Sequence, residues 1–170
     1  MIKQTTNTGV NIHTCVSMSP LNKIQYGISG IFGDFHADLL KKYYPDYIGE
    51  RVNVILSELI NNVIENTNDQ SSSLDFELKI HNRKLLIKVK NKVKYDTFLD
   101  VKNQLRKINE STDANAYMQQ TIRRKRAKNQ QGGLGLIRLT SETKASTNVR
   151  YHKDSSCMTI SAILQLGENE

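Results

Sequence analysis

The sequence predicts an α+β fold: a two-layer α/β sandwich with helices on one face of a mixed, mainly antiparallel sheet. Runs that alternate apolar and polar residues, typical of half-buried strands, occur near the beginning, in the middle and at the end of the chain. Between the first two lies Val52–Asn66, whose apolar residues recur with a helical period over a surface wide enough to be buried against a sheet. No internal repeat or linker divides the 170 residues, so residues 1–170 are expected to form one domain.

The first third of the chain predicts two strands and a helix. Residues 1–9 are polar and are expected to form a disordered tail. Val10–Met18 alternates apolar and polar residues and predicts a strand. Lys23–Phe32 resumes a short-period pattern broken by two glycines, which predicts a second strand with a bend. Asp34 is then expected to cap a helix that ends near Pro45.

The middle of the chain predicts a β-hairpin followed by two helices. Leu74–Ile80 and Leu85–Val89 are strand-like runs joined by four polar residues, so they are expected to pair with the apolar side chains of the first run facing inward. The apolar residues of Tyr95–Lys107 have helical spacing. A further helical stretch, Ala114–Ala127, follows a capping signal that ends at Asp113.

The last third predicts a helix and a closing hairpin. A glycine-rich run, Asn129–Gly135, passes directly into an apolar helix start, and the basic run Arg123–Lys128 lies just before it. Asn148–His152 and Cys157–Leu166 are strand-like and flank a short polar turn. Together with the earlier runs, these elements complete the predicted sheet and its helical layer.

Composition and charge narrow the function classes. The net charge of +7 and the pI near 9.4 suit an anionic partner, which could be a nucleic acid, a phosphate-bearing ligand or an acidic protein face. No apolar run approaches the ~20 residues of a membrane span, and the N-terminus lacks the apolar core of a signal peptide. We therefore expect a cytoplasmic protein without a membrane partner.

The two cysteines do not predict a metal or redox site. Cys15 and Cys157 lie far apart, without CxxC spacing or a nearby set of histidines, and are expected to be buried structural thiols. His13 is a lone histidine on the polar face of the first predicted strand, and no functional role is expected for it.

Polar residues interrupt the apolar pattern of Val52–Asn66 in a way that suits a ligand site. Glu58 and Asn62 lie four residues apart, so they project from the same face of a helix, with Asn66 one turn further on. The Asn62 side-chain oxygen could bind Mg²⁺, and the Glu58 carboxylate could accept a proton. The alternative is an amphipathic helix whose polar residues face solvent.

The glycine-rich run before the last predicted helix suits a phosphate site. Glycines at a helix N-terminus let backbone N–H groups approach phosphate oxygens, and the helix dipole favours negative charge there. Glycines also end helices and fill tight turns, so this run alone is a weak signal. The upstream basic run Arg123–Lys128 could contact phosphates or an acidic partner, or it could be a solvated helix end favoured by the dipole.

Taken together, these two motifs resemble those of a known superfamily. Glu58–Asn62 resembles the N box, and Gly132–Leu136 resembles the second glycine box, of the GHKL superfamily of histidine-kinase-like ATPases. The segments NKVKYDTFLDVKNQLRKINES and QQGGLGLIRLTSET are similar to those of SiaB-type bacterial serine/threonine kinases, related to anti-sigma-factor kinases. The resemblance covers about Ile24 to Leu166.

The resemblance implies a sandwich of the Bergerat type that binds ATP or ADP with Mg²⁺. It also implies serine/threonine kinase activity toward a STAS-domain protein in partner-switching signalling, and it leaves a homodimer open. The site residues that it implies are Glu58 as catalytic base, Asn62 as Mg²⁺ ligand, and Asn62, Asn66, Asn91, Gly132, Gly133, Leu134 and Gly135 as nucleotide-binding residues.

The sequence departs from the superfamily at Asn91. There the superfamily has an adenine-binding Asp in a DxGxG motif, whereas Asn91 is followed by Lys92 and Val93 without a glycine. An Asn carbonyl can accept from the adenine amino group, but without the charge of a carboxylate.

Two other function classes follow from these observations. The departure at Asn91 motivates a nucleotide-independent pseudo-kinase that sequesters its protein partner. The high pI and the basic run motivate a nucleic-acid-binding domain. The run contains no aromatic residue for base stacking, so no nucleic-acid partner is expected.

Overall fold

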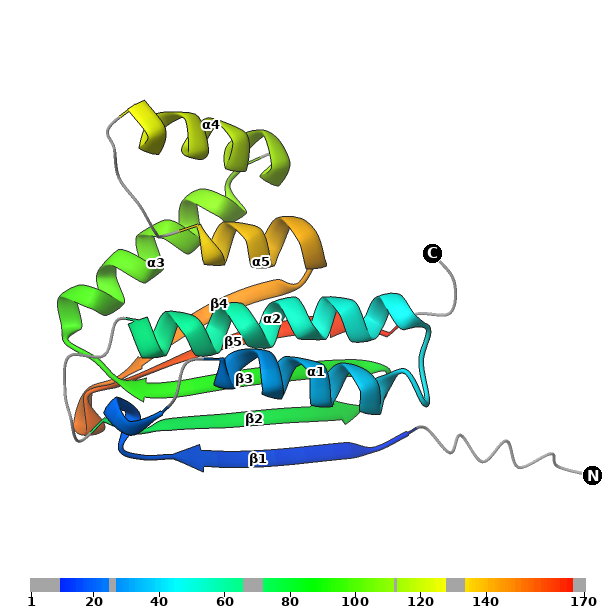
Figure 1. The fold of residues 1–170 in the computed structure, drawn as a ribbon. Helices are drawn as coiled ribbons and strands as arrows, with labels where there is room; N and C mark the ends of the chain where they lie inside the picture. Colours follow the sequence, from blue (N-terminus) through cyan, green and yellow to red (C-terminus); the bar gives the residue numbers. More distant parts are fainter. Residues whose placement is uncertain (1–9, 25–26, 66–71, 112, 128–133, 167–170) are drawn as a thin grey trace, which may run out of the picture.

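A computed structural model describes residues 10–24, 27–65, 72–111, 113–127 and 134–166 (Figure 1). The first nine residues, expected to be a tail, lie outside this part. The helices and strands, in chain order, are β1 (Ile12–Met18), α1 (Ile28–Leu40), α2 (Asp46–Glu65), β2 (Leu74–His81), β3 (Lys84–Lys92), α3 (Tyr95–Asn109), α4 (Ala114–Ala127), α5 (Gly135–Thr143), β4 (Ser146–His152) and β5 (Cys157–Gln165). Short 3₁₀ turns are formed by Leu21–Lys23 and Lys153–Ser155.

The five strands form one sheet in the order β1-β2-β3-β5-β4, and helices lie over one of its faces (Figure 1). All four strand pairings in the described part of the chain are antiparallel. The α+β class and the two layers are therefore confirmed, whereas the expected mixture of parallel and antiparallel pairs is wrong. The long connection from β3 to β4 carries three helices and returns the chain to the far edge of the sheet.

The central hairpin is confirmed, and its inward side chains make the sheet's half of the core. Alternate residues of β2, from Leu74 to Ile80, are buried, and β3 shows the same alternation. Two residues, Asn82 and Arg83, form the turn with φ of 49° and 59°, the left-handed pair whose twist matches paired strands. The predicted closing hairpin and the helices α3, α4 and α5 are also confirmed.

The helix α2 supplies most of the helical half of the core. It begins at Asp46, six residues before the predicted start at Val52. Burying each large aliphatic side chain contributes about 1.5–3 kcal/mol, so this one helix accounts for a large part of the folding free energy. Its buried residues are Ile48, Gly49, Val52, Ile55, Leu56, Leu59, Ile60 and Val63.

The prediction of a second strand over Lys23–Phe32 is wrong, because α1 begins at Ile28. Gly27 caps this helix with φ of 96°, a conformation that favours glycine. The buried face of α1 contains Ser29 and Gly33 as well as apolar residues, so its helical period is hard to see in an apolar pattern. A Cβ at Gly33 would lie 2.5 Å from Asn53 Oδ1 of α2, which explains why a glycine occupies the interface.

Asp34 is not a helix cap, since it lies in the middle of α1. Its Oδ1 accepts a hydrogen bond of 2.7 Å from Asn53 Nδ2, so the carboxylate joins α1 to α2. By contrast, Asp113 does cap α4: its Oδ1 accepts from the backbone N–H groups of Asn115 and Ala116 at 2.8 and 3.0 Å.

The expectation that both cysteines are buried is wrong. Cys15 is exposed, Cys157 is half-buried, and both are free thiols. Both lie on the face of the sheet that the helices leave open, where β1 and β5 present their polar residues. No helix in the described ranges is both long enough and apolar enough to cross a membrane.

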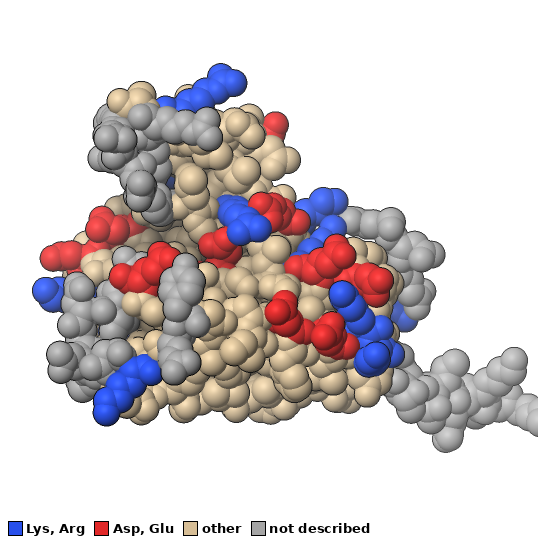
Figure 2. Space-filling view, viewed as in Figure 1, with Lys and Arg blue, Asp and Glu red and all other residues tan. Residues whose placement is uncertain are grey.

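The surface over α1 and α2 and the open face of the central strand differ in charge. Acidic side chains gather over α1 and α2 in Figure 2. The exposed acidic residues of these helices include Asp34, Asp38, Asp46 and Glu50. The open face of the sheet is basic along its central strand, because the outward positions of β3 are Lys84, Leu86, Lys88, Lys90 and Lys92.

A buried histidine joins α1 to the sheet. His36 is 1% exposed and packs against the rings of Phe32, Phe35 and Phe76. Its Nδ1 donates to the Phe32 carbonyl at 2.8 Å, while Nε2 has no hydrogen-bond partner among the described residues. Burial lowers the pKa of His36, and the hydrogen bond to Phe32 opposes this only in part.

This environment predicts a loss of stability in mild acid. With a depressed pKa in the native state, His36 takes up protons more readily when unfolded, so the free energy of unfolding falls as the pH drops below about 6.5. The slope from this one group approaches at most about 1.4 kcal/mol per pH unit. In His36→Phe, urea unfolding between pH 7.5 and 5 should give a flatter profile. His81→Phe, which replaces an exposed histidine, is the control and should keep the wild-type slope.

Candidate functional site

The two sequence motifs, far apart in the chain, meet where α5 begins beside α2. Glu58 and Asn62 are half-buried neighbours on one face of α2, and Gly135 is the first residue of α5. A Cβ at Gly135 would lie 2.5 Å from Glu58 Oε2 and 3.1 and 3.4 Å from Asn62 Nδ2 and Oδ1. The glycine therefore permits a close approach that any other residue would obstruct.

The start of α5 is fixed by its apolar residues. Leu136, Ile137 and Leu139 are buried in the core, which holds this helix against α2. Leu134 occupies the N-cap position without a side-chain cap, because leucine has no polar group. The first N–H groups of a helix have no intrahelical acceptor, so this end of α5 favours anions.

Arg138 belongs to this cluster, although the sequence analysis assigned it no role. Its Nη1 donates to Glu58 Oε1 at 2.9 Å, and its Nε donates to Glu142 Oε1 at 2.8 Å. The hydrogen bond to Glu142 is the main reason that the pKa of Arg138 is raised, and Glu58 adds to the effect. The available signal was spacing: Arg138 lies three residues after Gly135 and four before Glu142, on the same side of α5.

Glu58 is consequently held from two sides. Its side chain is 17% exposed; one oxygen is bonded to Arg138, and the other lies against Gly135. Oε1 can accept a proton only after its hydrogen bond from Arg138 is broken. The other oxygen, Oε2, is free of this ion pair and faces the start of α5.

Asn91 lies in the sheet layer. The inward positions of β3 are Leu85, Ile87, Val89 and Asn91, so a buried amide ends an otherwise apolar row. Asn91 is 6% exposed, and within the described part of the chain its Nδ2 makes only a long bond of 3.5 Å to the Lys92 carbonyl. An amide placed at such a position retains hydrogen-bonding capacity for a ligand.

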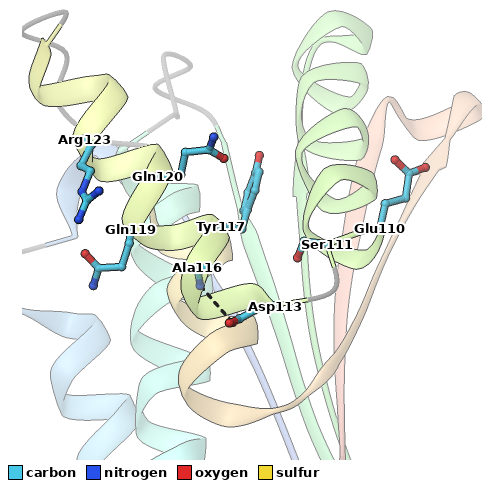
Figure 3. A pocket seen from close by; sticks show the side chains of 8 residues that line it. All are labelled: Glu110, Ser111, Asp113, Ala116, Tyr117, Gln119, Gln120 and Arg123. Carbon is cyan, nitrogen blue, oxygen red and sulfur yellow. Dashed lines mark hydrogen bonds between the residues drawn. The ribbon is translucent and has the colours of Figure 1, made fainter.

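Several predicted residues lie outside the described part of the chain: Asn66, Gly132 and Gly133. Leu134 is described and half-buried, with its side chain against the core. Of the basic run, Arg123 lines a cavity of about 670 Å³ between the end of α3 and α4, together with Glu110 and Tyr117 (Figure 3). Neither this cavity nor two smaller ones of about 310 Å³ is lined by Glu58, Asn62, Asn91 or Gly135.

The close approach at Gly135 can be tested by a double-mutant cycle. Gly135→Ala should lower the free energy of unfolding by about 1–3 kcal/mol, because the new methyl group displaces Glu58 from Arg138. In a Glu58→Ala background the same change should have an effect below about 0.5 kcal/mol, since the displaced group is gone. Urea unfolding of the four proteins measures the coupling.

The matched control is Gly30→Ala. A Cβ at Gly30 meets nothing within 4 Å, and the residue lies inside α1, so alanine should be neutral or stabilising by up to about 1 kcal/mol. Equal costs of Gly135→Ala with and without Glu58 would show that the two residues do not interact.

Comparison with known proteins leaves the site to be interpreted from its own geometry. No protein-family model matches the chain, and no curated protein matches it significantly. The arrangement of Glu58, Asn62, Gly135 and Arg138 is thus the basis for any functional conclusion.

Proposed function

We propose that the chain is a protein serine/threonine kinase of the histidine-kinase-like ATPase type. It would bind ATP with Mg²⁺ between α2 and α5 and transfer the γ-phosphoryl group to a hydroxyl of a STAS-domain partner in the cytoplasm. The observation that supports this most strongly is the convergence of Glu58 and Asn62 on Gly135 at the start of α5.

The residues present suit a magnesium–phosphate ligand. Mg²⁺ prefers oxygen ligands and is commonly held by one or two protein oxygens together with phosphates, and Asn62 Oδ1 is such an oxygen. The first N–H groups of α5, where negative charge is favoured, begin beside Glu58 and Asn62 because Gly135 has no side chain. Asn91, a buried amide on the helix-covered face of β3, is the proposed adenine-binding residue.

Each residue then has a separate task. When bound, Mg²⁺ supplies charge neutralisation for the phosphates. Glu58 accepts the proton of the attacking hydroxyl through Oε2, the oxygen outside the ion pair. Arg138 holds Glu58 in position through Oε1, and the start of α5 supplies backbone donors to the phosphate oxygens.

Glu58→Gln tests the proposed base. The amide keeps the size of the side chain and cannot accept the proton, so phosphoryl transfer should fall by about 10²–10⁴-fold. The affinity for Mg-ATP should stay within a few-fold of wild type. Calorimetry measures the binding, and transfer of labelled γ-phosphate to a STAS-domain protein that the wild-type chain phosphorylates measures the reaction. Unchanged transfer would exclude Glu58 as the base.

A second function, a pseudo-kinase that binds its partner without nucleotide, is favoured by two observations. Arg138 already occupies one oxygen of Glu58, and the proposed adenine-binding residue is a neutral amide with no glycine motif after it. In this case the chain would sequester a STAS-domain protein, and turnover would be absent.

Calorimetry with Mg-ATP separates these two functions. The kinase proposal expects a dissociation constant in the micromolar range or tighter, corresponding to about −8 kcal/mol, and at least a tenfold loss in Asn62→Ala. The pseudo-kinase proposal expects no heat of binding for either protein, while the STAS-domain partner still co-elutes with the chain. Lys102→Ala, a change on α3 away from Asn62, is the control for non-specific loss of binding.

A further inference from the structure

We propose that His13, Cys15 and Glu77 form a binding site for a divalent transition metal, Zn²⁺, on the open face of the sheet. One nitrogen, one sulfur and one oxygen from these side chains all lie within 4.8 Å of one another. In the described ranges of the chain, no other group of three His, Cys, Asp or Glu side chains is arranged in this way. The site is independent of the kinase proposal, because it lies on the opposite face of the sheet from α2.

Strand geometry brings the three ligands together. His13 and Cys15 are two residues apart on β1, so both side chains point to the same face. Glu77 of β2 is directly opposite Cys15 in the antiparallel register, and His13 lies two residues along β1, opposite Lys79. Paired strands are a rigid support, so the ligands are held in place before a metal arrives.

The His13 ring nitrogen lies close to both of the other ligand atoms. His13 Nε2 lies 3.1 Å from Glu77 Oε1 and 3.2 Å from Cys15 Sγ. In a tetrahedral zinc site with bonds of about 2.0–2.3 Å, neighbouring ligand atoms are roughly 3.3–3.6 Å apart. The two pairs that include His13 would need to separate by only a few tenths of an ångström to admit the ion, while the Cys15 sulfur and the Glu77 carboxylate oxygen lie within 4.8 Å of each other.

The chemistry of the ligands selects a borderline-soft metal. A thiolate and an imidazole favour Zn²⁺ over Mg²⁺ or Ca²⁺, which prefer oxygen ligands only. The Cys15 thiol would lose its proton on binding, so thiolate and carboxylate together balance the charge of the ion. Lys88 Nζ donates to Glu77 Oε2 at 2.9 Å, which leaves Oε1 directed toward His13 and fixes the orientation of the carboxylate.

Three protein ligands leave one coordination position for water. A cavity of about 310 Å³ lies beside the site, lined in part by Cys15, Glu77, Lys88, Lys90 and Thr159, and it has room for that ligand. An open fourth position distinguishes this arrangement from closed structural zinc sites. His13 and Cys15 are both exposed, so a metal ion can reach them from solvent.

Cobalt(II) is the probe for this site, because it replaces Zn²⁺ and gives a thiolate-to-metal charge-transfer band in the near ultraviolet. Titration of the metal-free chain should produce this band with one equivalent of Co²⁺, and one equivalent of Zn²⁺ should abolish it. Cys15→Ser should eliminate the band. His13→Ala and Glu77→Gln should each weaken Co²⁺ binding by at least about tenfold.

The chain supplies its own matched control in Cys157→Ser. Cys157 is the second of the two cysteines, and it pairs with His152 where β4 and β5 meet. Among the described residues, no carboxylate joins these two side chains to make a group of three ligands. This variant should keep the full band and the wild-type affinity. Far-ultraviolet circular dichroism of each variant establishes that it is folded.

Three results would overturn the proposal: no charge-transfer band in the wild-type chain, a band that is lost in Cys157→Ser but kept in Cys15→Ser, or unchanged affinity in Glu77→Gln. None of these outcomes bears on nucleotide binding, which is measured separately.

Discussion

Close packing around α2 is the constraint on which the rest of the structure depends. This helix packs against the sheet, α1 and α5, so the polar side chains on its flanks must fit between neighbouring helices. Glycines make this possible on two sides. Gly33 of α1 lies against Asn53 and Ser57, and Gly135 of α5 lies against Glu58 and Asn62. A side chain at either glycine would force a polar group of α2 out of position.

This packing also explains how the candidate site is preorganised. Glu58 cannot rotate freely, because Arg138 holds one oxygen and Gly135 approaches the other. A half-buried ion pair of this kind orients a carboxylate without contributing much net stability, since desolvation offsets most of the attraction. The main effect of the ion pair is therefore to fix the position of the Glu58 carboxylate. The same ion pair supports the pseudo-kinase alternative, because Arg138 occupies one carboxylate oxygen of Glu58, the proposed base.

Sequence patterns predicted the elements whose apolar period is complete, including the β2–β3 hairpin, α2 and α5. The pattern failed over residues 23–32, because the helix that begins there, α1, has Ser29 and, just beyond this range, Gly33 in place of apolar residues on its buried face. Long-range polar contacts were not predictable, because no local spacing shows that Arg138 meets Glu58 or that Glu77 lies opposite Cys15. The exposure of Cys15 was predictable, because Cys15 lies two residues after His13 and so shares the polar face of the strand, yet it was expected to be buried.

The surface over α1 and α2 and the central strand of the open sheet face differ in charge. Acidic residues are exposed on α1 and α2, whereas Lys88 and Lys90 lie on the open face of the central strand. The long-range field of such a molecule orients an approaching partner before contact. An acidic protein is drawn to the lysines of β3 and kept away from α1 and α2, whereas a basic surface is drawn toward α1 and α2. Encounter rates on the two faces should therefore respond to a partner's charge in opposite directions.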